Sequence, residues 1–396
     1  MKAKTLGILA AITIVGIVVA VFVSQEPASQ LPGSGELLFP SLLSVVNNVS
    51  EVVVETKDQT VTLVRGEKTW RVKEKAGYRA DVEKVKQTLI GLAEVRILEP
   101  KTKNPELYDR LGLQDKEQEG SLSTTVTLKT PNNSEAAVVI LGNQRPAKGN
   151  PRMSEIYVRK PGDPQTWLTI GNLPLEKVAG EWLDTEITAL TTKRVHRVTV
   201  THPGGESLLV LREKPDDLDF QLDSIPAGSK VASQFNVNNV VGTLVQLSLE
   251  DVKKEEEMNF QNHTGVTVVL ETFDGLRLHV QTAKQEGKFF GKFSAEFDQK
   301  LVQSVRDAPP PEKGETVQAQ DSAQDEMDLG SPEGKQTDEE QGKRSSKEES
   351  ILKKPEEVQG EVEAFNQRVQ GWAYQLPTFR VENFSKAKSD LLATIP

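Results

Sequence analysis

The chain has 396 residues, a formal net charge of −10, four histidines and no cysteine. The acidic balance argues against a nucleic-acid-binding protein, which needs a basic face to neutralise phosphates. The lack of cysteine excludes disulfides, thiolate metal sites, a cysteine nucleophile and a lipid-bearing N-terminal cysteine. At roughly 100–200 residues per domain, the length predicts two domains or an internal duplication.

An apolar, uncharged run of 18 residues lies near the N-terminus, at residues 6–23. A helix rises about 1.5 Å per residue, so this run would measure about 27 Å, close to the hydrocarbon thickness of a bilayer. Lys2 and Lys4 precede it, and the next Lys or Arg is Lys57. The positive-inside rule then places the N-terminus in the cytoplasm. The sequence predicts a cytoplasmic tip and transmembrane anchor over residues 1–24, with the lipid bilayer as its partner.

A cleaved signal peptide is the alternative to an uncleaved anchor. The apolar region of a signal peptide usually spans about 7–15 residues and ends in a small-x-small cleavage site. Ser24 and Ala28 have Phe22 and Glu26 two positions earlier, so both are poor matches to such a site. We therefore favour the anchor. We expect a single-pass protein of the inner membrane, with the bulk of the chain in the periplasm.

Two polar stretches mark boundaries in the rest of the chain. Residues 25–44 begin with a segment rich in Pro and Gly (QEPASQLPGSG), which predicts a tether. Residues 306–357 carry 8 basic and 15 acidic side chains and no aromatic one. Such a composition buries too little apolar surface to offset the entropy lost on ordering. We predict that residues 306–357 form a disordered acidic insertion, a solvated spacer and not a binding tail.

Residues 45–190 predict a first α+β unit. Alternating apolar and β-branched residues around Val52–Val54 and Trp70 are typical of half-buried strands. Asp81 can cap a helix whose apolar stripe steps by 3, 4 and 3 residues, at Val82, Val85, Leu89 and Leu92. Further strand patterns follow at residues 124–130, 136–141, 156–159 and 167–170.

Residues 191–305 repeat this pattern, which predicts an internal duplication. Val49–Glu55 aligns with Val195–Thr201 at an offset of 146 residues. A second apolar stripe starts at Val237, with Asn236 in the capping place that Asp81 has in the first unit. Later strand patterns return at residues 266–273 and 276–280, joined by Asp274-Gly275. That dipeptide between alternating runs predicts a tight hairpin in which both turn residues have φ > 0.

The C-terminal residues 358–396 predict structure again. Val358, Val362, Phe365 and Val369 step by 4, 3 and 4 residues, which indicates an amphipathic helix. We expect this helical segment to pack back on the second repeat. The predicted fold class is α+β: an N-terminal transmembrane helix followed by two repeated units of mixed or antiparallel sheet with packed helices.

Four short motifs carry a resemblance to a known family. Two are the element Gly371–Pro377 (GWAYQLP) and the ending Ser389–Leu392 (SDLL). Two weaker ones are Leu107–Leu113 (LYDRLGL) and Trp182–Asp184 (WLD). With the predicted anchor and the duplicated units, the chain resembles the bacterial family called domain of unknown function 4340. The resemblance covers residues 45–305 and 358–396, and the long acidic insertion departs from the compact pattern of the family.

The resemblance implies a location and a partner, but no chemistry. Members of the family look like membrane-anchored proteins on the outer side of the inner membrane. They are often associated with ABC-type export systems similar to those linked to gliding motility. The resemblance therefore implies an ABC transporter permease or a related envelope protein as a partner. It carries no catalytic residue over to this chain.

The histidines do not form a metal motif. His196 and His202 flank a predicted strand at equal parity, so a metal pair is conceivable, but no third ligand accompanies them and His202 lies in a turn. His279 has the polar parity of a hairpin strand, and His263 has no partner in the pattern. We predict no metal site, no cofactor and no catalytic residue.

Other chemistries lack their motifs or stay open. The sequence has no Gly-x-Ser-x-Gly elbow and no Walker loop, so neither a serine hydrolase of that type nor ATP hydrolysis by this chain is predicted. The 58 acidic residues leave paired carboxylates for glycoside cleavage open, without singling out a pair. The tryptophans could form a glycan platform, although Trp70 and Trp167 have the pattern of core residues; the full set is Trp70, Trp167, Trp182 and Trp372.

Three functions remain as hypotheses. The first is a noncatalytic, single-pass inner-membrane protein whose periplasmic domain acts as a binding or scaffold component of an ABC-type export system. In it, exposed strand edges or a groove would hold a partner or an exported chain. The second is an envelope enzyme that acts on glycans through paired carboxylates. The third is a glycan-binding module.

Overall fold

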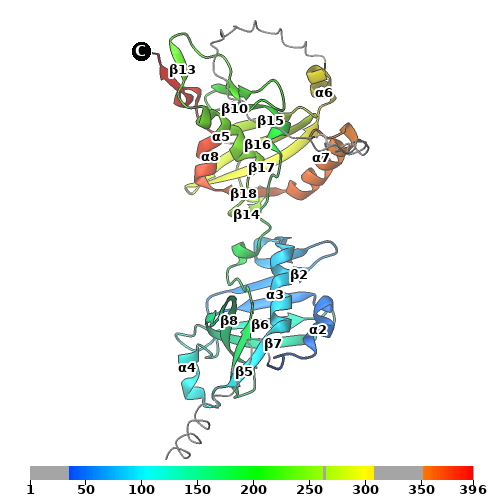
Figure 1. The fold of residues 1–396 in the computed structure, drawn as a ribbon, viewed down its shortest axis with the longest axis vertical. Helices are drawn as coiled ribbons and strands as arrows, with labels where there is room; N and C mark the ends of the chain where they lie inside the picture. The colour runs from blue at the N-terminus through cyan, green and yellow to red at the C-terminus, as the bar shows by residue number, and fades with distance from the viewer. Residues whose placement is uncertain (1–34, 262–264, 307–350, 396) are drawn as a thin grey trace, which may run out of the picture. The chain divides into compact units, whose positions relative to one another are not determined.

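The computed structural model describes residues 35–261, 265–306 and 351–395 (Figure 1). The chain divides into two compact units. Unit 1 comprises Met1–Thr185 and Asp251–Lys253, and unit 2 comprises Glu186–Glu250 and Lys254–Pro396. Each unit is described by itself below.

Unit 1 is built on one nine-stranded sheet with the order β4-β3-β2-β1-β6-β7-β8-β9-β5. Its strands are β1 (Glu51–Glu55), β2 (Thr60–Arg65), β3 (Trp70–Val72), β4 (Tyr78–Arg79), β5 (Arg96–Pro100), β6 (Thr124–Lys129), β7 (Glu135–Ala147), β8 (Asn150–Arg159) and β9 (Thr166–Gly171). Its helices are α2 (Leu42–Val45), α3 (Val82–Glu94) and α4 (Tyr108–Leu111).

The second large sheet has eight strands in the order β12-β11-β10-β15-β16-β17-β18-β14. They are β10 (Val195–Thr201), β11 (Ser207–Leu211), β12 (Gln221–Leu222), β14 (Asp251–Lys254), β15 (Thr267–Thr272), β16 (Leu276–Gln285), β17 (Lys288–Phe297) and β18 (Trp372–Leu376). A separate small sheet pairs β13 (Ser229–Val231) with β19 (Leu392–Thr394). The helices of unit 2 are α5 (Gln234–Val245), α6 (Gln299–Arg306), α7 (Pro355–Val369) and α8 (Thr378–Phe384).

The two large sheets have the same strand order when each strand is matched with its counterpart in the other half of the chain. Strands β3, β2, β1, β6, β7, β8, β9 and β5 correspond in order to β12, β11, β10, β15, β16, β17, β18 and β14. Matched core positions are also alike: Val52 and Val54 of β1 are buried, as are Val198 and Val200 of β10. In both strands the alternate residues are partly exposed, so one face of each sheet is the core face.

Helix α3 forms as its sequence predicts. The Asp81 carboxylate accepts hydrogen bonds from the backbone N–H groups of Glu83 and Lys84, at 3.0 and 3.1 Å. The stripe that includes Leu89 and Leu92 is buried. The cap expected at Asn236 is wrong, because α5 starts at Gln234 and Asn236 lies inside it. The N-cap is Ser233, whose backbone is extended, so the helix starts before the predicted position.

The hairpin between β15 and β16 is confirmed, but its turn differs from the predicted one. Three residues, Phe273, Asp274 and Gly275, connect the strands. Gly275 has a φ of +93°, whereas Asp274 is not among the positive-φ residues. The predicted two-residue turn is therefore wrong. The reason is tertiary, because the buried Asp274 carboxylate is held by an arginine from before β10.

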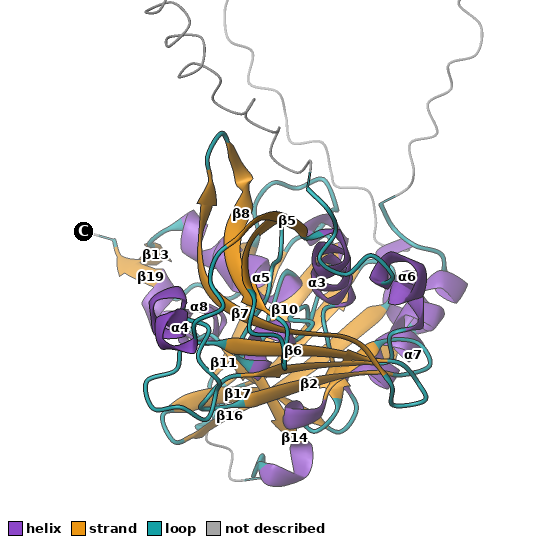
Figure 2. Cartoon of the chain, turned by 90° about the horizontal axis from the view of Figure 1, so that it is seen from below, coloured by secondary structure: helices purple, strands orange, loops and turns teal. Residues whose placement is uncertain are grey.

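The expected fold class also needs correction. The described residues form mostly antiparallel sheets with few helices, as the strands in Figure 2 show, and not a mixed α+β chain led by a transmembrane helix. Among the described residues, no helix is long and apolar enough to cross a membrane. The longest, α7, has 15 residues and one buried stripe, because it covers a sheet on one side only. The apolar run at residues 6–23 lies outside the described residues.

Two predicted boundaries fall differently in the structure. Within the expected tether, Leu38 and Leu42 are buried in unit 1, and the Leu38 N–H donates to the Val95 carbonyl at 2.8 Å. At the end of the expected acidic insertion, α7 begins at Pro355. Residues 307–350 of that insertion lie outside the described residues. In both places, apolar residues only a few positions from the polar stretch are buried in a unit. The adjoining chain is therefore part of that unit.

Candidate functional site

One face of the unit 2 sheet carries a row of alternating charges. Arg197 of β10, Glu271 of β15 and Arg277 of β16 are direct cross-strand neighbours, and Glu296 of β17 lies opposite Arg277. Arg197 pairs with Glu271, Arg277 pairs with Glu271 at 2.7 Å, and Arg277 pairs with Glu296 at 2.9 Å. Opposite charges directly across strands stabilise a sheet, so this row holds four strands in register.

Glu271 is the buried member of this row. Its side chain is 6% exposed, and burial alone would raise its pKa. Hydrogen bonds from Arg197 and Arg277 outweigh burial and hold the pKa of Glu271 below its ordinary value. The carboxylate is therefore ionised and fully engaged at neutral pH.

A groove lies beside this row. It has a volume of about 670 Å³, and we call it the polar groove. Its wall includes residues of the 3-10 helix η6 (Glu255–Glu257) and of β16, β17 and α7. Among them are Glu255, His279, Gln281, Lys292, Ser294 and Asn366. A second hollow of about 960 Å³ shares Glu255, Lys292 and Gly371 with it. The two hollows therefore meet at these three residues.

The two formally charged residues that line the polar groove, Lys292 and Glu255, are paired with each other. Lys292 Nζ lies 3.2 Å from Glu255 Oε1, and His279 Nε2 lies 3.4 Å from Glu296 Oε1. Gln281 Nε2 donates to the Phe260 carbonyl at 2.9 Å. These contacts leave a wall of oriented donors and acceptors, which suits recognition of a polar partner.

Helix α7 forms the wall of the groove along β17. Strand β18 pairs with β17 only over Phe289–Gly291. Further along β17, the Asn366 amide of α7 takes over: its Nδ2 donates to the Ala295 carbonyl and its Oδ1 accepts from the Ala295 N–H, both at 2.8 Å. The side chain thus imitates a neighbouring strand, and the groove lies between these two contacts.

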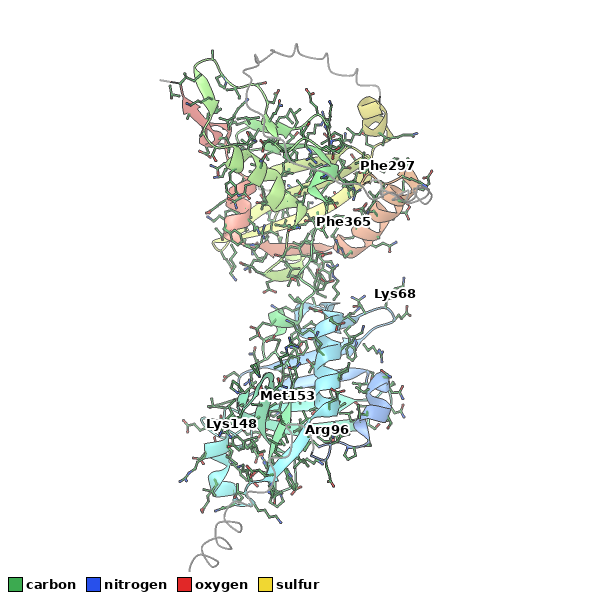
Figure 3. All side chains as sticks on the ribbon, in the orientation of Figure 1. Lys68, Arg96, Lys148, Met153, Phe297 and Phe365 are labelled. Carbon is green, nitrogen blue, oxygen red and sulfur yellow. The ribbon has the colours of Figure 1, made fainter. Side chains whose placement is uncertain are left out.

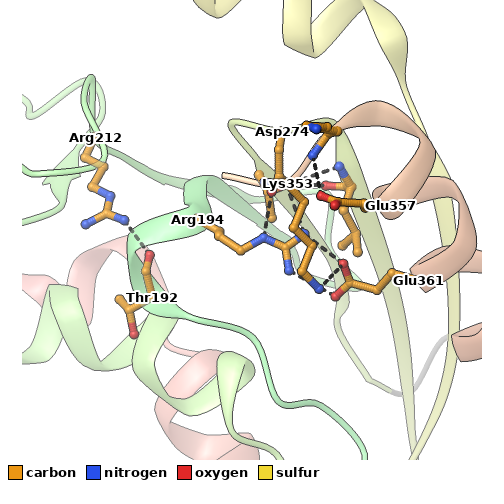
Figure 4. A network of polar contacts seen from close by, with 10 residues as sticks. Thr192, Arg194, Arg212, Asp274, Lys353, Glu357 and Glu361 are labelled. Atoms are coloured by element: carbon orange, nitrogen blue, oxygen red, sulfur yellow. Dashed lines mark hydrogen bonds and ion pairs between the residues drawn. The ribbon is translucent and has the colours of Figure 1, made fainter. Parts of the chain in front are cut away.

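A buried ionic network holds α7 in this position (Figure 4). Arg194 lies 2.7 Å from Asp274 and 2.9 Å from Glu361 of α7. Lys353 donates through its backbone N–H to Asp274 at 3.1 Å and pairs through Nζ with Glu361 at 2.9 Å. Thr272 Oγ1 donates to Asp274 at 2.5 Å. Every charge in the network has a partner, so its role is to position α7.

The pKa shifts in the network agree with this role. Burial would raise the pKa of Glu361, but hydrogen bonds from Arg194 and Lys353 bring it below the ordinary value of a glutamate. Burial would lower the pKa of Arg194, but its bonds to Glu361 and Asp274 raise it above the ordinary value. Both groups stay charged near neutral pH and act as fixed ion-pair partners.

The histidines are used in local contacts. His196 Nδ1 lies 2.8 Å from the Arg212 carbonyl, and its ring lies 4.8 Å from that of Phe273, where burial lowers its pKa. His202 Nε2 lies 3.3 Å from the Lys386 carbonyl. Across the described ranges, no group of three or more His, Asp or Glu could hold a metal ion. His263 lies outside those ranges.

The tryptophans do not gather into an open platform. Trp70 and Trp182 are buried, at 5% and 0% exposure. Lys254 Nζ lies 3.8 Å from the centre of the Trp372 ring and covers its face. Trp167 is partly buried in β9. Trp70 and Trp182 are therefore core residues, whereas Trp167 and Trp372 are partly exposed. Glycan binding stays a hypothesis.

Sequence reasoning did not identify the polar groove. Of its polar side chains, only His279 was singled out, and it is 39% exposed; Val369 and Gly371 were named for the predicted helix and the family motif. Strand β17 and the segment before β15 were not predicted at all. Asn366 was part of the predicted amphipathic helix. Its pairing with the edge of β17 could not be predicted, because no pattern in the nearby sequence indicates it.

Comparison with protein families gives one match. Residues 70–263 match the model of the family described as Domain of unknown function (DUF4340). The span contains both weaker motifs, Leu107–Leu113 and Trp182–Asp184, but not Gly371–Pro377. The match supports the resemblance to this family. No curated protein and no solved structure matches the chain.

Proposed function

We propose that the protein is a noncatalytic binding protein, an accessory or scaffold component of an ABC-type export system of the bacterial envelope. The polar groove of unit 2 is the observation that carries the proposal. It is open, large enough for a peptide segment, and walled by side chains whose charges are already paired. A wall of this kind orients a bound chain through hydrogen bonds.

The shape of the sheet edges favours a groove over strand addition. The two-residue strands β4 and β12 lie at one end of each large sheet. At the other ends lie β14, with four residues, and β5, which ends in Pro100. Short edges and prolines are features that discourage pairing with another chain. A partner that binds by β-augmentation would find little ladder to extend, whereas the polar groove offers side-chain contacts.

The family resemblance supports the location and the class of partner. We propose the periplasmic side of the inner membrane as the location and a transporter permease or related envelope protein as the partner. The enzyme hypothesis has weaker support in the described residues. Its carboxylates would have to be free to exchange protons, but Glu255 is paired with Lys292 and Glu296 with Arg277.

Co-purification of the full chain in mild detergent tests the proposal. Transporter subunits should be recovered with the wild-type chain. Ser294→Trp should remove them, because Ser294 is exposed in the groove and tryptophan suits a strand. Thr60→Trp is the matched control, since Thr60 is exposed on β2 of unit 1 and does not line the groove. Recovery of the wild-type chain without transporter subunits above background would refute the proposal. Equal recovery with Ser294→Trp would refute the groove as the contact.

A further inference from the structure

Unit 1 has a groove of different character, between α3 and the β2–β3 hairpin. It has a volume of about 330 Å³, and we call it the α3 groove. Its floor is apolar, with Trp70, Val82, Leu89 and Ile90. Ile90 is 49% exposed, so this part of the floor is open to solvent.

The rim of the α3 groove is basic. Arg65, Lys68 and Lys86 line it, with Glu67 as the sole carboxylate among its lining residues, in a chain whose net charge is −10. Lys86 has only a 4.0 Å contact with Glu83, between side chains that are 61% and 70% exposed. No carboxylate of the described residues is ion-paired with Arg65 or Lys68. Arg65 Nη1 donates to the carbonyls of Asn47 and Val49. Lys68 and Lys86 are therefore the rim cations that are open to an acidic ligand.

In unit 2, the position that corresponds to the α3 groove lies beside the connection between β11 and β12. Arg212 lies over the ring of Phe220 at 4.7 Å, as Arg65 lies over Trp70 at 5.8 Å in unit 1. The β2–β3 connection is residues 66–69, whereas the β11–β12 connection is residues 212–220. The matched hairpins thus differ mainly in the length of this connection.

The longer connection is acidic and lies against α5. Its segment Glu213–Asp219 has the sequence EKPDDLD. Arg212 donates to the Asp217 carbonyl at 3.1 Å, and Asn238 of α5 donates to the Asp219 carboxylate at 2.7 Å. Asp216 and Asp217 oppose the lowering of the Arg212 pKa by burial. The acidic connection of unit 2 thus reaches α5 at its end, through Asp219 and Phe220, while Leu218 is 93% exposed.

We propose that the α3 groove binds an acidic, extended segment of a partner protein. Its carboxylates would face Lys68 and Lys86, and an apolar side chain would cover Ile90. Charge complementarity with the rim lysines points to this ligand, and the acidic connection that contacts α5 in unit 2 supplies a sequence for the probe. The site is separate from the polar groove and does not depend on the transporter role.

A labelled peptide tests the proposal on the full chain. The probe has the sequence of residues 213–220, EKPDDLDF, and fluorescence anisotropy measures its binding. The comparison peptide, EKPNNLNF, replaces the three aspartates by asparagines. We expect the acidic probe to bind at least about tenfold more tightly, with an affinity that falls as salt is raised. Equal binding of the two peptides, or no binding of the acidic one, would overturn the proposal.

Paired variants identify the site. Lys68→Glu with Lys86→Glu should weaken probe binding about tenfold or more. The matched control, Lys57→Glu with Lys148→Glu, makes the same change in net charge at exposed lysines outside the groove. Figure 3 shows Lys68 and Lys148 far apart on unit 1. The control should bind like the wild type. An equal loss in both double variants would show attraction to net charge alone and refute the site.

A third variant tests the apolar part of the site. Ile90→Asn should weaken binding of the probe several-fold while the chain stays folded, because Ile90 is half exposed on a helix.

Anionic lipid vesicles test a membrane surface as the alternative ligand. Vesicles bound more tightly than the peptide, with the same loss on Lys68→Glu and Lys86→Glu, would assign the groove to a membrane surface and overturn the peptide proposal.

Discussion

The two sheets carry the same charge motif with opposite signs. In unit 1, Lys129 of β6 has Glu51 and Glu135 as its cross-strand neighbours. At the matched places in unit 2, Glu271 of β15 has Arg197 and Arg277. Lys129 lies 2.7 Å from Glu51, and this hydrogen bond raises the pKa of Lys129 above its ordinary value. The fold thus requires that opposite charges alternate across the strands, but the central charge can have either sign.

Burial distinguishes the two motifs. The Lys129 side chain is 28% exposed, whereas that of Glu271 is 6% exposed. Water can solvate the central charge in unit 1 when a partner is removed, but it cannot reach the one in unit 2 to the same degree. Unit 2 also has the Arg194 network, which holds α7 in the connection between β17 and β18. The corresponding connection in unit 1, between β8 and β9, is a short loop without a helix. Charge substitutions should therefore harm unit 2 more than unit 1.

The largest effect is expected for Arg194→Leu. The substitution leaves Asp274 and Glu361 without their buried cation, which costs about 3–5 kcal/mol. Urea unfolding measures the loss, and hydrogen exchange should show α7 deprotected first. Arg110→Leu is the control at an exposed arginine of unit 1, where we expect a change within about 0.5 kcal/mol. Equal effects of the two substitutions would contradict a structural role for the network.

A smaller loss is expected for Glu271→Gln. The amide cannot balance Arg197 and Arg277, and we expect a loss of about 2–3 kcal/mol because both arginines keep some contact with water. Lys129→Gln is the matched change in unit 1, and its effect on stability should be much smaller. Hydrogen exchange of β15 and β6 distinguishes the units. A larger loss for Lys129→Gln would reverse the comparison.

The pH dependence should also differ between the units. The pKa values of Glu271 and Glu361 are lowered in the folded chain, so their stabilisation is complete above the unfolded value of about 4.3 and is lost as the pH falls below it. Unit 2 should therefore lose stability as the pH falls from about 5 toward 3. Thermal unfolding of Glu271→Gln across this range should show a shallower slope than the wild type, and an unchanged slope would argue against the shift at Glu271.

The smallest effect is expected for a sign reversal in unit 1. Glu51→Lys, Lys129→Glu and Glu135→Lys together give it the pattern of unit 2. The triple variant should unfold close to the wild type, because each charge keeps an opposite neighbour. Lys129→Glu alone places three carboxylates in a row and should be less stable than the triple variant. Chevron or urea midpoints can rank the two. If the triple variant is the less stable one, the sign matters and not only the alternation.

The sequence predicted much of the framework and little of the candidate sites. The α3 stripe, the cap at Asp81 and the hairpin around Gly275 depend on residues close together in the chain, and local periodicity reveals such features. Strand β17 was missed because its four phenylalanines do not follow one parity. The groove beside it needs η6, β16, β17 and α7 together. No short window contains those four elements.

By itself, the sequence determined which residues face inward and where the strand pattern starts again, since both follow from the spacing of apolar side chains within a few residues. Only the tertiary structure decided the rest: the three-residue turn at Asp274, the placement of α7 and the open α3 groove. Arg194 meets Asp274 and Glu361 across 80 and 167 residues of chain. Contacts of that span arise from how the strands are ordered in a sheet, and side-chain spacing along the chain does not encode that order.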